Sequence, residues 1–69
     1  MIKVIIIDDE EHVRTNVLQK VTSHFEEEIR VVAEANGVVS GLATIYKHEP
    51  DLLLLDINMQ DGTGFDLLE

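Results

Sequence analysis

The sequence contains no cysteine, which excludes disulfide bonds and thiolate metal sites. No stretch approaches the roughly 20 hydrophobic residues that a membrane-spanning helix needs. The first residues also lack the charged, hydrophobic and cleavage regions of a signal peptide. We therefore expect a cytoplasmic protein without membrane contact. The length of 69 residues bounds the chain to one domain at most.

Basic residues are few: five lysines and arginines stand against fourteen aspartates and glutamates, which gives a formal net charge of −9 at pH 7. This charge repels nucleic acid phosphates, so we expect no direct contact between this segment and nucleic acid. It is compatible with cation binding, with a basic partner surface, or simply with solubility. Hydrophobic residues make up 45% of the chain, which is typical of globular rather than disordered proteins.

Hydrophobic residues follow two different periods along the chain. Short continuous runs at residues 2–7, 29–35 and 51–55 predict strands, and the first and third runs are typical of strands buried on both faces. Helical spacing defines two apolar faces, one formed by Val13, Val17, Leu18, Val21 and Phe25 and the other by Val39, Leu42, Ala43 and Tyr46. We accordingly expect Tyr46 to lie in the core.

The predicted second helix has recognisable ends. Asn36 and Gly37 form a turn signal, and either Asn36 or Ser40 is a candidate helix cap. Pro50 forces Glu49 out of helical geometry and ends the helix. After the third strand, a loop containing Gly62 leads to the expected first turn of a third helix at residues 65–68.

Strands that alternate with helices predict an α/β fold in the order β-α-β-α-β followed by the start of a helix, with a parallel sheet and helices on its faces. Functional sites of such sheets form at the carboxyl ends of the strands. The first strand runs directly into Asp8 and Asp9, and the third runs into Asp56. If these two strands are neighbours, three carboxylates converge at one edge of the sheet.

A cluster of carboxylates without histidine or cysteine favours a hard cation such as Mg²⁺. A carboxylate beside such a cation is suited to accept a phosphoryl group. Asp56 fits the nucleophile because no second acid adjoins it in the sequence, and Asp9, supported by Asp8, fits the metal. Taken singly, Asp8 or Asp9 is equally well explained as a helix N-cap, and Asp56 as a cap or turn former.

Three motifs carry a family resemblance: VIIIDDE at residues 4–10, PDLLLLDINM at 50–59 and DGTGF at 61–65. They resemble the receiver domain family of bacterial two-component response regulators, and the resemblance covers residues 1–69. It implies a flavodoxin-like, doubly wound parallel sheet. It makes Asp56 the phosphoacceptor and Asp9 a direct Mg²⁺ ligand, with Asp8 in the acidic pocket and the backbone carbonyl of Asn58 as a further ligand. Gln60 departs from the family, which usually has proline there.

The resemblance also implies partners. A sensor histidine kinase would supply the phosphoryl group, and DNA would be reached through an output domain, which the sequence suggests to be of the LytTR type. Such a chain is not an enzyme in the usual sense, because the phosphoryl transfer is to its own aspartate. A Mg²⁺-dependent phosphatase is a weaker interpretation, because Asn58 stands where those enzymes have a second aspartate.

Relative to the family, residues 1–69 correspond to an incomplete receiver domain that lacks the last two βα units. The missing units carry a threonine or serine, a lysine and an aromatic residue that serve phosphoryl binding and switching. We therefore expect the activity of this polypeptide alone to be impaired, and its open third strand to permit self-association. The alternative function is a non-catalytic, receiver-like dimerisation or interaction module.

Overall fold

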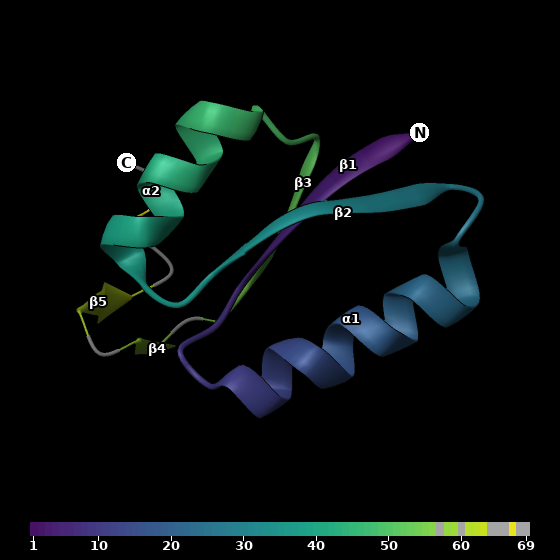
Figure 1. Cartoon of the computed structure of the whole chain (residues 1–69). Helices are drawn as coiled ribbons and strands as arrows, with labels where there is room; N and C mark the ends of the chain where they lie inside the picture. Colours follow the sequence, from purple (N-terminus) through teal and green to yellow (C-terminus); the bar gives the residue numbers. More distant parts are fainter. Residues whose placement is uncertain (57, 60, 64–66, 68–69) are drawn as a thin grey trace.

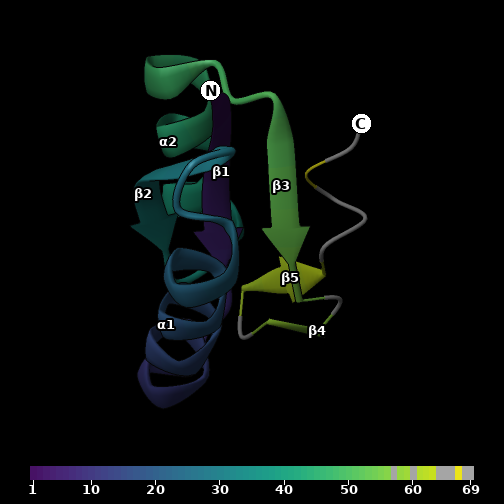
Figure 2. The same ribbon diagram turned by 90° about the vertical axis from the view of Figure 1, so that its right-hand side faces the viewer.

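The computed structural model describes residues 1–56, 58–59, 61–63 and 67. Its elements are, in chain order, β1 (Ile2–Ile7), α1 (Glu11–Phe25), β2 (Ile29–Ala35), α2 (Val38–His48), β3 (Leu52–Leu55), β4 (Asn58–Met59) and β5 (Gly62–Thr63). The first three strands form a parallel sheet in the order β2-β1-β3 (Figure 2). The predicted β-α-β-α-β order is confirmed, and the first and third strands are neighbours.

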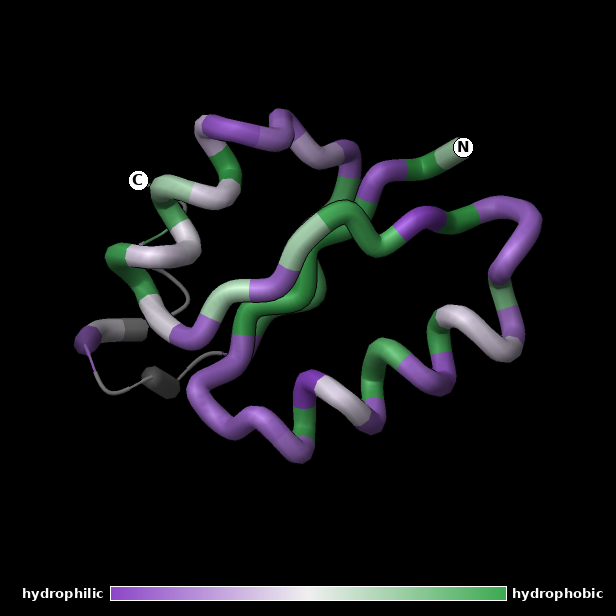
Figure 3. The backbone as a smooth tube through the Cα atoms, viewed as in Figure 1, coloured by the Kyte–Doolittle hydropathy of each residue, from purple (hydrophilic) through white to green (hydrophobic). Residues whose placement is uncertain are grey.

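The central strand β1 carries most of the core. Its residues Val4 to Ile7 are almost completely buried, because β2 and β3 flank it and the two helices lie on opposite sides of the sheet (Figure 1). Beneath α2, Ile5 and Ile7 pack with Ala35, Val38 and Leu67. The hydropathy of the backbone follows this arrangement, with hydrophobic strands in the middle and a polar turn between β1 and α1 (Figure 3).

The inward face of α2 differs from the predicted one. Val39 is 72% exposed and Tyr46 81% exposed, so the prediction that Tyr46 lies in the core was wrong. The face that meets the sheet contains Val38 and Gly41 instead. Gly41 allows this close approach, since a Cβ atom there would lie 3.2 Å from Cδ1 of Ile7. Two apolar faces are compatible with the spacing of hydrophobic residues, and packing on Ile7 selects one of them.

The predicted caps of α2 were also wrong. Gly37 is the N-cap residue, while the Ser40 hydroxyl donates to Oδ1 of Asn36 at 2.8 Å. At the other end, Glu49 leaves the right-handed helical region, as Pro50 predicts, and adopts a left-handed conformation with φ of 46°. Its N–H still donates to the carbonyl of Ile45 at 2.9 Å.

The third strand is shorter and less buried than expected. It begins at Leu52, because the Asp51 carboxylate accepts a hydrogen bond from the Lys3 N–H at 2.9 Å. Leu52 is 45% exposed, since β3 lies at an edge of the sheet that the described residues form. Self-association through this edge stays a prediction.

The segment after β3 contains a short hairpin in place of the predicted loop, with Asn58 paired to Thr63 and Met59 to Gly62. The predicted turn at residues 65–68 lies outside the described residues except for Leu67, which is buried. In the part of the chain that the structure describes, no helix is long and hydrophobic enough to cross a membrane.

Candidate functional site

Three carboxylates meet at the carboxyl edge of the sheet. Asp8 and Asp9 follow β1, Asp56 follows β3, and one oxygen atom of each lies within 4.8 Å of those of the other two. All three residues are half-buried, so the cluster is open to solvent on one side. The sequence predicted this convergence on the condition that β1 and β3 are neighbours, and the structure meets that condition.

The hydrogen-bond ladder of the sheet explains why the acidic side chains come together. Ile7 pairs with Leu55 at the end of the β1–β3 ladder. One residue further on, the Asp56 N–H donates to the Ile7 carbonyl at 2.9 Å, and the Asp8 N–H donates to the Ala35 carbonyl at 3.1 Å. Both backbones are therefore held in strand-like positions up to their first acidic residue, which fixes where the side chains begin.

The alternative that Asp8 or Asp9 is the N-cap of α1 is not supported. Glu10 occupies the N-cap position and makes no side-chain capping bond. One oxygen of the Asp8 carboxylate accepts the Glu10 N–H at 2.9 Å, which closes a local turn before the helix. This bond closes the turn formed by residues 8–10, which we call the acidic turn.

The chemistry of the donor set fits a hard divalent cation. Three carboxylates within 4.8 Å repel one another unless a proton or a cation compensates their charge. Oxygen ligands without nitrogen or sulfur favour Mg²⁺ or Ca²⁺ over zinc. Asn58, the fourth predicted ligand through its backbone carbonyl, lies in β4, two residues beyond Asp56. Its role as a ligand stays a prediction.

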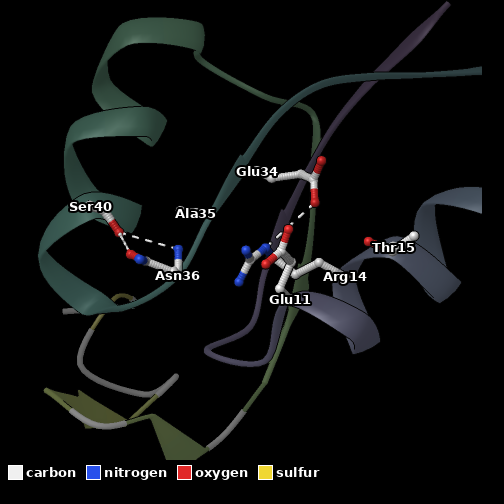
Figure 4. Close-up of a pocket in the computed structure, with 7 residues that line it drawn as sticks. All are labelled: Glu11, Arg14, Thr15, Glu34, Ala35, Asn36 and Ser40. Carbon is white, nitrogen blue, oxygen red and sulfur yellow. Dashed lines mark hydrogen bonds and ion pairs between the residues drawn. The ribbon is translucent and has the colours of Figure 1, made fainter.

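Arg14 is a site residue that the sequence analysis missed. Its Nη1 donates to the Asp8 carbonyl at 2.7 Å, and its Nε lies 3.5 Å from Oε1 of Glu34. Figure 4 shows the Arg14 side chain reaching from α1 towards Glu34, with Glu11 beside it. The guanidinium thus links the acidic turn to β2. The only signal in the sequence is a basic residue six positions after Asp8, which is weak by itself.

Asp61 is a second residue that was missed. Its carboxylate accepts the N–H groups of Val38 at 2.7 Å and Val39 at 3.1 Å, the first residues of α2. These bonds, that of Val38 first, hold the pKa of the Asp61 carboxyl below its ordinary value. The favourable field at a helix N-terminus acts in the same direction. No local pattern reveals this pairing, because 23 residues separate Asp61 from Val38.

The comparison with known families agrees with this arrangement. The profile of the response regulator receiver domain matches residues 4–69. The chain belongs to the response regulator receiver domain family. The resemblance seen in the three sequence motifs is thereby confirmed, and so is the expected α/β fold.

The individual relatives are named as transcriptional regulators or as a sensory transduction protein. The chain is 37% identical over 68 residues to the transcriptional regulatory protein BtsR of Escherichia coli K12, and 39% identical over 66 residues to the sensory transduction protein LytT of Enterococcus faecalis. It is 34% identical over 67 residues to the DNA-binding transcriptional activator DevR/DosR of Mycobacterium tuberculosis. These alignments cover 99%, 96% and 97% of this chain, but only 28%, 26% and 30% of the relatives.

Proposed function

We propose that the chain is a phosphoacceptor receiver domain in which Asp56 accepts a phosphoryl group from a phosphohistidine of a sensor histidine kinase. One observation carries the proposal: in a member of this family, the carboxylates of Asp8, Asp9 and Asp56 gather within 4.8 Å of one another at the carboxyl ends of two adjacent strands. Such an edge is where α/β sheets bind their ligands.

The proposed step is a direct transfer. A carboxylate oxygen of Asp56 attacks the phosphorus atom, the phosphorus–nitrogen bond of the phosphohistidine breaks, and the imidazole leaves with the bonding electron pair. The product is an acyl phosphate on Asp56. Because the acceptor is part of the chain and is consumed, the reaction is a self-modification and not enzymatic turnover.

The other site residues prepare this step. Asp9 and Asp8, together with Asp56 and the Asn58 carbonyl, would hold Mg²⁺, which when bound offsets the negative charge of the phosphoryl oxygens. The hydrogen bond from the Asp56 N–H to the Ile7 carbonyl fixes the backbone of the nucleophile. Arg14 holds the acidic turn through the Asp8 carbonyl, so that the acids are in place before the donor arrives.

The proposal extends to the protein as a whole. A cytoplasmic kinase partner requires the receiver to be cytoplasmic as well. The similarity to LytT and BtsR supports a transcription regulator with a LytTR-type output domain, through which DNA would be bound. The net charge of −9 supports a receiver segment that makes no direct DNA contact itself.

The test is covalent labelling of the full-length protein with acetyl phosphate and Mg²⁺, followed by intact mass spectrometry. We expect one phosphoryl group on the wild-type protein and none on Asp56→Asn. Asp51→Asn is the matched control, because Asp51 lies at the opposite end of β3 and loses the same charge. Labelling of Asp56→Asn at the wild-type level would overturn the assignment.

The same experiment separates the proposal from a non-catalytic interaction module. Such a module would show neither labelling nor stabilisation by Mg²⁺ in the wild-type protein. A protein that is labelled only with Mg²⁺ present, and that loses labelling in Asp9→Asn, is a receiver with a working metal site.

A further inference from the structure

We propose that Asp61 is a positioning residue, which fixes the segment after the phosphoacceptor against the N-terminus of α2 and thereby places the Asn58 carbonyl at the acidic cluster. The inference rests on the proposed function, because it concerns the same metal site. Asp61 itself touches neither the metal nor the phosphoryl group in this proposal.

The attachment of Asp61 to α2 has two points. Both carboxylate oxygens are used, one by the Val38 N–H at 2.7 Å and the other by the Val39 N–H at 3.1 Å. The N-cap residue, Gly37, has no side chain with which to bind these groups. Two bonds from one rigid carboxylate restrict both the position and the orientation of Asp61.

Gly37 makes room for this attachment. A Cβ atom on Gly37 would lie 2.7 Å from Oδ1 of Asp61, and its three nearest neighbours would all be atoms of that carboxyl group. The φ of Gly37 is −176°, an extended conformation that any residue adopts. The glycine is therefore needed for space and not for its backbone freedom, and the space it leaves is occupied by Asp61.

Asp56 and Asp61, which lie on either side of Asn58 in the chain, are therefore both anchored. The Asp56 N–H is bound to the Ile7 carbonyl in the sheet, and the Asp61 carboxylate is bound to α2. Between these anchors lies Asn58, which is also paired with Thr63 in the hairpin. Figure 1 shows the hairpin below the start of α2, close to the carboxyl ends of the strands. Releasing the Asp61 anchor leaves Asn58 with fewer restraints on its distance from Asp8, Asp9 and Asp56.

Asp61 could act only as a helix cap, or it could also position the residues after Asp56. One pair of variants distinguishes these two roles. Asp61→Ala removes both the cap and the anchor. The double variant Gly37→Ser with Asp61→Ala restores a local cap, because serine is a favourable N-cap residue and the atoms that would clash with its Cβ are gone. It does not restore the anchor to the segment after Asp56.

The experiment measures Mg²⁺ binding to the full-length protein by isothermal titration calorimetry, with urea unfolding in EDTA as the stability readout. We expect Asp61→Ala to lower the Mg²⁺ affinity roughly tenfold. This is the lower end of the range of losses seen when residues that orient metal ligands are replaced. In the double variant the unfolding midpoint recovers towards wild type, whereas the Mg²⁺ affinity stays low. Asp51→Ala controls for the loss of one negative charge and should bind Mg²⁺ like wild type.

The remaining outcomes are also decisive. Wild-type Mg²⁺ affinity in Asp61→Ala, or recovery of affinity together with stability in the double variant, would reduce Asp61 to a helix cap and overturn the inference. In either case, Mg²⁺ binding that is present in wild type and lost in Asp9→Asn leaves the proposed function standing. If wild type binds no Mg²⁺, the proposed function fails, and the inference fails with it.

Discussion

The backbone N–H of Asp56 donates a hydrogen bond to the carbonyl oxygen of Ile7 at 2.9 Å, one residue beyond the last paired position of β1 and β3. This bond extends the ladder to the first residue after β3, while Asp8 is held in the same way on the other side of β1 by the Ala35 carbonyl. The sheet therefore sets the positions of the acidic residues. The effect of their charges on the stability of the fold can be measured without any phosphodonor.

Repulsion within the cluster leads to a prediction for Asp9→Asn. Three like charges within 4.8 Å of one another are expected to repel when no cation is bound. In EDTA at low salt, we expect the variant to be more stable than wild type by up to about 1 kcal/mol, the repulsion of two unit charges about 4 Å apart in water. At saturating Mg²⁺ we expect wild type to be the more stable of the two, because Mg²⁺ binds its folded state more tightly and so stabilises it more.

Urea unfolding followed by circular dichroism, in EDTA and in Mg²⁺, measures both effects. Asp51→Asn serves as the control, and its stability relative to wild type should not depend on Mg²⁺. A wild-type protein that is more stable than Asp9→Asn in EDTA would mean that hydrogen bonds at the cluster outweigh its charge repulsion.

Removal of the Arg14 side-chain bonds should destabilise the fold. The Arg14 side chain is only 16% exposed, and its guanidinium donates to the Asp8 carbonyl at 2.7 Å. Hydrogen bonds to charged groups contribute about 1.5–3 kcal/mol, so we expect Arg14→Gln to lower the free energy of unfolding by about that amount. Lys20→Gln changes the same charge on an exposed position of α1 and should cost little. Equal effects of the two substitutions in urea unfolding would contradict the assigned role of Arg14.

The packing of α2 predicts losses of stability of different size when two small residues, Gly41 and Ala43, are replaced by valine. A Cβ at Gly41 would lie 3.2 Å from Ile7 and 3.4 Å from Leu67, so Gly41→Val overfills the interface and should cost about 1–3 kcal/mol. Ala43 is exposed on the same helix, and Ala43→Val should cost well under about 1 kcal/mol through helix propensity. Thermal unfolding of the two variants is the measurement. A larger loss for Ala43→Val would show that the helix packs with a different face.

The lowered pKa of Asp61 predicts how its contribution to the stability of the fold depends on pH. Because the folded pKa lies below the unfolded one, the contribution is complete above the unfolded value of about 3.9 and is lost as the pH falls through the folded pKa. Wild type should therefore be more stable than Asp61→Asn at pH 6, and the difference should shrink below about pH 4. Urea midpoints at a series of pH values test this, and a difference that does not change with pH would exclude an ionic contribution.

The sequence by itself determined the order of the parallel strands and the two helices along the chain, and it pointed to three acidic residues at the strand ends. The hydrophobic runs at Ile2–Ile7 and Ile29–Ala35 predict the first two strands with their observed bounds, because strand burial is encoded by neighbouring residues. Asp8, Asp9 and Asp56 are recognisable as a group, since parallel strands bring their carboxyl ends to one edge.

Only the tertiary structure decided which face of α2 is buried and which distant groups Asp61 and Arg14 bind. The α2 sequence offers two apolar faces, and the contact between Gly41 and Ile7 selects the one that leaves Tyr46 exposed. The bonds of Asp61 to Val38 and Val39 join residues more than 20 positions apart. Such contacts depend on the order of the strands and the packing of the helices, and no short-range pattern of residue types specifies them.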